Sequence, residues 1–171
     1  MGLSKQLFLF DVYNWTIYLN NMKKIITLAL LLGVAVMGFA QTNPVSWKFT
    51  TKKIADKTYE VHLTATMESG WHLYSQTQPE DAIAMPTKFK FTANPLVTLD
   101  GDVKEKGKME KFHDAKLGAS ANQYSKTVDF VQVVKVKSSV KTSLLGELTF
   151  QTCDDKKCLP PKKVPFIIPL G

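Results

Sequence analysis

The sequence contains no arginine, so all 22 of its basic residues are lysines. Without guanidinium groups, the chain has no side chain that contacts guanine or phosphate through two parallel hydrogen bonds. The lysines are scattered singly among alternating apolar residues, where they favour solubility and discourage edge-to-edge pairing of strands. We therefore exclude nucleic acid as a partner, although the formal net charge is +7.

Apolar runs long enough to span a bilayer are also missing, and the longest apolar run lies near the start of the sequence. Ile25–Met37 is an apolar run of about 13 residues, short of the roughly 20 that cross a bilayer as a helix. Two lysines precede it, and the small residues Gly38 and Ala40 follow it. This layout predicts a signal peptide helix over residues 22–40, with cleavage after Ala40. An uncleaved membrane anchor is the alternative.

Residues 1–21 precede this leader and contain an aromatic cluster of their own. We interpret their presence as the result of a start codon assigned too early, with Met22 the true initiator, or we interpret them as a disordered extension. A second apolar element packed on a membrane is the alternative. Export to the periplasm leaves residues 41–171 as one domain of ordinary size. Its 19 lysines and 14 acidic residues give a formal charge of +5.

Period-two alternation of apolar and polar residues dominates residues 41–171. Tyr59–Met67 alternates strictly, which is typical of a half-buried antiparallel strand. In Val128–Lys137 the alternation slips at Val133 and Val134, which predicts a bulge. Further strands are expected at Val45–Ile54, Phe89–Phe91, Leu148–Phe150 and Val164–Ile168. No helical period extends over three turns.

About seven short strands with turn residues between them predict an all-β fold, an immunoglobulin-like antiparallel β-sandwich. The Cys–Trp–Cys spacing of antibody domains is missing. Two longer connections, Ser75–Met85 and Lys104–Ser125, are candidates for functional loops.

Cysteine is scarce, and both cysteines lie in one hexapeptide, at Cys153 and Cys158. In an exported chain this spacing predicts a disulfide across a hairpin. A ring of about six residues stabilises a fold by only about 2 kcal/mol, against about 3 for a 15-residue loop. The small gain weakens a purely structural role for the disulfide without excluding it. The neighbouring lysines favour a Cys158 thiolate and the neighbouring carboxylates oppose it.

Three blocks of the sequence resemble the periplasmic amino-terminal domain of the thiol–disulfide interchange protein DsbD. The first is Ser69–Gln76, and the second is the loop Gly107–Tyr124, which leads into a β-branched strand. The third and most specific block runs from Phe150 through the cysteine pair to Pro160 and Pro161. The likeness covers nearly all of residues 43–171.

The resemblance implies a redox-active cysteine pair that needs no cofactor and no metal. Such a domain receives electrons from a membrane-embedded thiol reductant and passes them to thioredoxin-like periplasmic proteins, which serve disulfide isomerisation and cytochrome c maturation. It would act as a component of a protein-disulfide reductase, without a small-molecule substrate. By position, Cys158 would form the intermolecular mixed disulfide and Cys153 would resolve it. Trp71, His72 and Tyr74 would flank the pair.

The resemblance also implies a loop that covers the disulfide, for which Phe112 is the candidate residue. Two features depart from the family. Its best-known members have one more residue between the cysteines, and they continue into a membrane domain and a thioredoxin-like domain. We therefore expect a separate carrier that works with a separately encoded membrane partner, or a relic that retained the fold.

Three other functions compete with thiol–disulfide exchange. Cys153 and Cys158 with His62, His72 and His113 would supply metal ligands, although a four-residue spacer is unusual for zinc. A non-catalytic immunoglobulin-like binding module would use Trp71 and Tyr74 as exposed aromatic contacts and the disulfide as a structural bond. A serine hydrolase is disfavoured because no Gly-x-Ser-x-Gly occurs.

Overall fold

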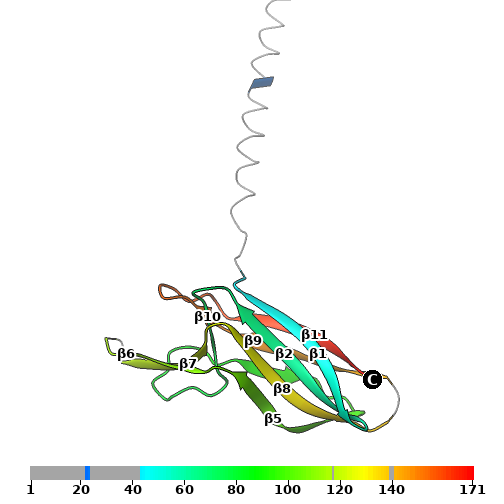
Figure 1. The fold of residues 1–171 in the computed structure, drawn as a ribbon. Helices are drawn as coiled ribbons and strands as arrows, with labels where there is room; N and C mark the ends of the chain where they lie inside the picture. Colours follow the sequence, from blue (N-terminus) through cyan, green and yellow to red (C-terminus); the bar gives the residue numbers. More distant parts are fainter. Residues whose placement is uncertain (1–21, 24–42, 117, 139–140) are drawn as a thin grey trace, which may run out of the picture. The chain divides into compact units, whose positions relative to one another are not determined.

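Eleven strands in three antiparallel sheets form the regular structure of residues 43–116, 118–138 and 141–171 in the computed structural model (Figure 1). Sheet A has the order β1 (Val45–Ala55), β2 (Thr58–Met67), β8 (Thr127–Val136) and β5 (Val97–Gly107). Sheet B has the order β10 (Thr152–Cys153), β3 (His72–Tyr74), β7 (Ala119–Tyr124) and β6 (Glu110–Asp114). Sheet C has the order β11 (Lys162–Leu170), β9 (Thr142–Phe150) and β4 (Lys88–Phe91). The predicted all-β, immunoglobulin-like antiparallel fold is confirmed.

The main core lies between sheets A and C. Alternate residues of β2 and β8, among them Leu63 and Phe130, point inward and are fully buried. Leu148 and Ile168 of sheet C pack in the same core. Burial of these alternate side chains is what the period-two pattern requires of strands with one face toward a core. The main core therefore holds the sandwich together independently of the cysteines, neither of which belongs to it.

Lys104–Ser125 is a set of paired strands rather than the expected long loop. Strand β5 continues to Gly107, and β6 and β7 then form a hairpin in which Phe112 lies opposite Ala121. The sequence of β7, ASANQY, has few of the β-branched residues that mark strands. Its structure depends instead on main-chain pairing with β3 and β6.

The irregularity expected at Val133 and Val134 lies on the neighbouring strand. Strand β8 pairs with β2 without interruption, whereas the register of β5 shifts between Asp100 and Lys104. Gln132 stands at an inward position of β8 and is 1% exposed. Its side-chain amide donates to the main-chain oxygen of Gly101, at 3.1 Å. The bulge in β5 thus supplies an acceptor to a buried amide, which would be costly to leave unpaired.

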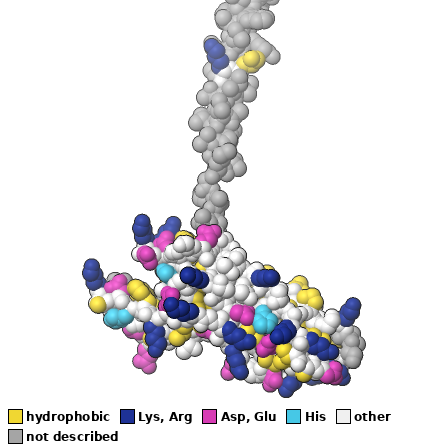
Figure 2. All heavy atoms as spheres, in the orientation of Figure 1, with side chains coloured by type: hydrophobic (Ala, Val, Ile, Leu, Met, Phe, Trp, Pro, Cys, Tyr) yellow, Lys and Arg dark blue, Asp and Glu magenta, His cyan; other side chains and the backbone are white. Residues whose placement is uncertain are grey.

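Sheet B lies at one end of the domain, opposite the end where the chain terminates (Figure 1). The hairpin that carries the cysteines is at this end, next to β10. On the face shown in Figure 2, lysine side chains are spread between acidic ones rather than gathered in one patch. This distribution agrees with the role in solubility that the sequence predicts for the lysines.

The structure describes residues 22–23, 43–116, 118–138 and 141–171, and Asn43–Gly171 form one compact unit. The expected extension 1–21, nearly all of the signal peptide 22–40 and its cleavage site lie outside the described residues, so these remain predictions. In the part of the chain that is described, there is no helix with the length and apolar character needed to span a bilayer.

Candidate functional site

A tight hairpin brings the two cysteines together. Cys153 ends β10 and forms an antiparallel bridge with Cys158, with their Cα atoms 4.0 Å apart and an S–S bond of 1.98 Å. The Asp154 N–H donates to the Lys157 carbonyl and the Leu159 N–H donates to the Thr152 carbonyl, both at 2.9 Å. These two bonds bracket the cysteines, so main-chain pairing holds the sulfurs opposite each other.

Asp154 organises the turn between the cysteines. Its Oδ1 accepts the main-chain N–H groups of Lys156 at 2.8 Å and Lys157 at 2.7 Å. These two hydrogen bonds favour the charged carboxylate and lower the pKa of Asp154 below its usual value, and the lysine charges make a smaller contribution. The carboxylate charge is thereby directed into the turn.

The two cysteines differ in exposure. Cys153 is 3% exposed and packs in a small apolar cluster with Tyr74 and Ala121. Cys158 is exposed at the surface. Thiol–disulfide exchange requires the attacking thiolate to reach a sulfur. A foreign thiol can therefore approach Cys158 but not Cys153.

His72, Tyr74 and Phe112 lie on the same face of sheet B as Cys153. Directly paired residues, and residues two apart on one strand, share a face of a sheet. Cys153 is paired with His72, and Tyr74 lies two residues further along β3. Phe112 is paired with Ala121, which packs against Tyr74 and Cys153. Phe112 is 51% exposed and stands at the far strand of the sheet, and its role as a cover for the disulfide stays a prediction.

Trp71 is directed elsewhere. It precedes β3 and packs against the main core of the sandwich, whereas the cluster around Cys153 contains Tyr74. Burial raises the pKa of the Tyr74 hydroxyl. Among the aromatic residues of the Ser69–Gln76 block, Tyr74 is the one that contacts the buried cysteine.

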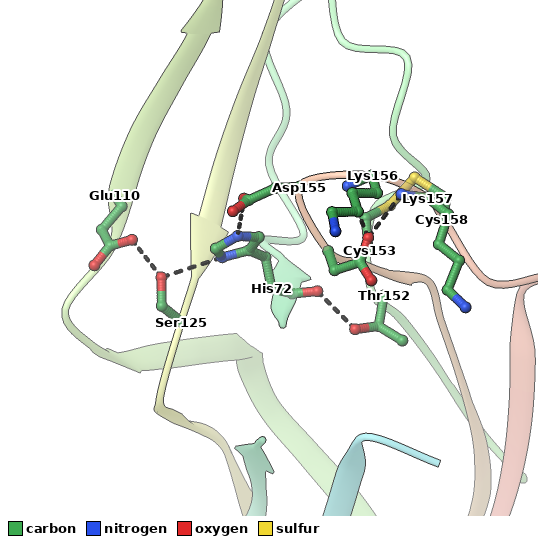
Figure 3. Close-up of polar contacts among 10 residues, drawn as sticks. His72, Glu110, Ser125, Thr152, Cys153, Asp155, Lys156, Lys157 and Cys158 are labelled. Atoms are coloured by element: carbon green, nitrogen blue, oxygen red, sulfur yellow. Dashed lines mark hydrogen bonds and ion pairs between the residues drawn. A yellow bond between two sulfur atoms is a disulfide. The ribbon is translucent and has the colours of Figure 1, made fainter. Parts of the chain in front are cut away.

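His72 links the cysteine hairpin to the rest of sheet B (Figure 3). Its Nε2 lies 3.4 Å from Asp155 Oδ1 in the turn, and its Nδ1 lies 3.3 Å from Ser125 Oγ. Ser125 in turn donates to Glu110 on β6. The ring thus connects the turn between the cysteines with strands at the other side of the sheet.

Part of the connection Ser75–Met85, which the sequence marks as a candidate functional loop, lies against the buried cysteine. Ala84 packs against the cluster of Cys153, Tyr74 and Ala121. The Met85 N–H donates to Gln151 Oε1 at 2.9 Å, which ties the segment to the start of the cysteine hairpin. The length of the connection was the only signal in the sequence, because an alanine side chain has no functional group that would indicate contact with a cysteine.

Glu105 on β5 anchors the first residues of this covering segment. Its carboxylate accepts the Ser75 hydroxyl at 2.8 Å, the Gln76 N–H at 2.7 Å and the Tyr124 hydroxyl at 2.6 Å. Burial raises the pKa of Tyr124, and the hydrogen bond and charge of Glu105 raise it further. The tyrosine therefore remains a neutral donor to Glu105 at physiological pH.

The three histidines have separate surroundings. The Nδ1 atom of His62 lies 2.7 Å from Asp129 Oδ2 on sheet A, that of His113 lies 2.9 Å from Ser120 Oγ, and His72 is next to the disulfide. Within the residues that the structure describes, no three His, Cys, Asp or Glu side chains form a group suited to a metal ion.

Residues 39–167 match the profile of the family described as "Thiol:disulfide interchange protein DsbD, N-terminal". No curated protein matches the sequence.

Solved structures show the same type of fold. The N-terminal periplasmic domain of ScsB from Proteus mirabilis is 19% identical, with a TM-score of 0.52, and the match covers 75% of this chain and 48% of that one. This chain thus spans about half the length of the ScsB chain it matches.

Two structures from Neisseria meningitidis are also similar. The reduced DsbD N-terminal domain is 17% identical, with a TM-score of 0.49, and the match covers 78% of this chain and 91% of that one. A complex of the DsbD and PilB N-terminal domains gives 15% identity, a TM-score of 0.45 and coverage of 76% and 86%. The profile match, which covers most of the sequence, shows that this chain belongs to the family of DsbD N-terminal domains.

Proposed function

We propose that the chain is a periplasmic thiol–disulfide exchange domain that relays electrons through the Cys153–Cys158 pair. The electron donor would be a membrane-embedded thiol reductant, and the acceptors would be thioredoxin-like periplasmic proteins. The observation that carries the proposal is the unequal exposure of the two bonded cysteine residues, with Cys158 at the surface and Cys153 buried. Family membership supports the same chemistry.

Reduction of the pair begins at the exposed sulfur. A partner thiolate attacks Cys158 Sγ, the Cys153–Cys158 bond breaks, and its electron pair stays on Cys153 Sγ, which takes up a proton. A second partner thiolate then attacks the partner sulfur of the mixed disulfide. This step releases an oxidised partner and a Cys158 thiolate, so that two electrons have entered the pair.

Donation to an acceptor follows the same path in reverse. The Cys158 thiolate attacks the disulfide of an oxidised thioredoxin-like protein and forms a mixed disulfide. Cys153 loses its proton and attacks Cys158 Sγ, which releases the reduced acceptor and restores the intramolecular bond. Cys153 lies in the apolar cluster with Tyr74 and Ala121 and is bonded to Cys158. It is therefore better placed than a foreign thiol to attack Cys158 Sγ in the mixed disulfide.

The reduction potential of the pair tests this proposal. A carrier needs a value near those of its partners, about −120 to −270 mV, whereas structural disulfides in secreted proteins lie below about −300 mV. Equilibration of the folded protein with glutathione or dithiothreitol buffers, followed by mass spectrometry of alkylated thiols, measures it. A value below about −300 mV would favour the non-catalytic binding module.

Trapping experiments then identify which sulfur exchanges. Cys153→Ala, with Cys158 left alone at the surface, should form a stable mixed disulfide with an oxidised thioredoxin-like protein. Cys158→Ala is the matched control, since its remaining thiol is buried and should trap nothing. Equal trapping by both variants, or none by Cys153→Ala, would contradict the assigned roles.

A further inference from the structure

The side chain of Gln151 lies where three segments of the chain meet. Gln151 stands between β9 and β10, two residues before the buried Cys153. Its Oε1 accepts the Met85 N–H at 2.9 Å, and its Nε2 donates to the Leu159 carbonyl at 3.3 Å. Met85 belongs to the connection that lies against Cys153, and Leu159 directly follows Cys158. One amide group therefore joins this connection to both halves of the cysteine hairpin.

The bond to Met85 bears directly on how Cys153 is buried. Ala84, which directly precedes Met85, packs against the apolar cluster that contains Cys153. A methyl group forms no hydrogen bond of its own, so the position of Ala84 depends on the main chain beside it. That main chain is held at Met85 by the carbonyl oxygen of the Gln151 side chain.

The connection has further attachments that do not involve Gln151. The Gln78 side-chain amide donates to the Asn122 carbonyl at 2.8 Å, and the Thr87 hydroxyl donates to the Tyr74 carbonyl. Loss of the Gln151 bonds should therefore free the residues between these two points locally. The connection would stay attached on both sides, and the main core would not be disturbed.

We propose that Gln151 is a positioning residue that determines which cysteine a foreign thiol reaches. By holding Ala84 against Cys153, it leaves Cys158 as the point of attack. This inference rests on the proposed function and adds the residue that makes the exchange selective. Attack at Cys153 instead would leave the exposed Cys158 as the resolving thiol, where other thiols have access to it.

Alkylation of a lone Cys153 tests this role. The background is Cys158→Ala, in which no disulfide forms within the chain, and the probe is iodoacetamide, which is uncharged and reacts irreversibly. Gln151→Leu removes both hydrogen bonds at a similar side-chain volume. Gln151→Glu keeps an oxygen that accepts the Met85 N–H and loses the donor to Leu159. Mass spectrometry of the intact protein measures the labelling rate.

Gln151→Leu should raise the labelling rate of Cys153 about two- to tenfold, which is the change in an opening equilibrium that one net hydrogen bond produces. Gln151→Glu should keep the rate near that of the background, because it retains the bond to Met85. In the Cys153→Ala background, Gln151→Leu should leave the labelling of Cys158 unchanged, since Cys158 is already exposed. A general loss of stability would not separate these results.

The matched control is Asn94→Ala, because the Asn94 amide also joins two segments of the chain. It donates to the Ser143 carbonyl at 3.0 Å and accepts the Leu96 N–H at 2.9 Å, near the start of β9. Gln151 follows the other end of that strand. The control should therefore leave the labelling of Cys153 unchanged.

Three results would overturn the inference. They are an unchanged Cys153 rate in Gln151→Leu, an equal rise in Asn94→Ala, and an equal rise in Gln151→Glu. Hydrogen exchange of the original protein gives a test that needs no substitution. The Met85 N–H should exchange slowly, and exchange as fast as that of a free amide would also overturn the inference.

The outcome is separate from that of the proposed function, because alkylation involves no redox partner. A reduction potential below about −300 mV would overturn the carrier role and leave the shielding by Gln151 standing. A potential within the range of carriers, with unchanged labelling in Gln151→Leu, would overturn the inference alone.

Discussion

Reduction of the Cys153–Cys158 bond should lower the free energy of unfolding by only about 2 kcal/mol. The bond closes a ring of about six residues, and the chain-entropy relation gives about 2 kcal/mol for a ring of that size. Neither cysteine belongs to the main core between sheets A and C, so the sandwich packing remains when the bond is broken. For a domain of about 130 residues, the loss corresponds to a fall of about 8 °C in Tm.

The same stabilisation of about 2 kcal/mol also affects the reduction potential of the pair. Because folding favours the bond by about 2 kcal/mol, the folded pair should be harder to reduce than the pair in the unfolded chain, by about 45 mV. A shift of this size is modest compared with the range of potentials that carriers cover. The fold therefore positions the pair without locking it in the oxidised state.

Urea unfolding followed by circular dichroism, with and without a phosphine reductant, measures the effect. The double variant Cys153→Ala/Cys158→Ala is the control, and should unfold near the midpoint of the reduced protein. A loss of about 5 kcal/mol or more, or unfolding on reduction alone, would place the bond among structural disulfides and refute the reasoning.

Three further predictions concern the hairpin and the core. After reduction, alkylation should label Cys158 at least about tenfold faster than the buried Cys153, and equal labelling by mass spectrometry would contradict their unequal exposure. Asp154→Ala should make the reduction potential less negative at pH 7. The turn loses the carboxylate that accepts the Lys156 and Lys157 N–H groups, so the hairpin holds the bonded cysteines less firmly. Since hydrogen bonds lower the pKa of Asp154, its stabilisation is complete above the ordinary carboxyl pKa and is lost as pH falls through the lowered one. The difference from the original protein should therefore vanish in acid, and a constant difference would argue against this origin. Gly146→Ala would bring a Cβ atom within 2.5 Å of the Phe166 ring, and should cost about 1–3 kcal/mol in urea unfolding. An unchanged midpoint would contradict this expectation, because the main-chain oxygen of Lys90, 2.7 Å from the same Cβ position, cannot move aside as the Phe166 ring could.

The long strands of the sandwich are predictable because their burial repeats every second residue. The pattern over Tyr59–Met67 predicts a strand, and β2 extends over Thr58–Met67. Strands β6 and β7 are harder to predict in this way, because β6 (EKFHD) has one apolar residue and the alternation of β7 (ASANQY) rests on alanine, which is not typical of strands. Strand β6 pairs with β7 in a hairpin, and β7 also pairs with β3, which is distant in the sequence. A local pattern does not contain that second pairing.

The pairing of Cys153 with Cys158 follows from their spacing, since a four-residue turn brings both strands together. Their unequal exposure does not follow from it. Cys153 is buried by Ala84, Tyr74 and Ala121, which come from three separate parts of the chain. The contact of Asp155 likewise depends on where His72 lies in the folded sheet.

The two hydrogen bonds that bracket the cysteines are formed by main-chain atoms alone. Residues 155–157 at the tip can therefore be replaced while the sulfurs keep their positions. Substitutions at these three positions would therefore vary the charge beside the reactive pair without altering the scaffold that holds it.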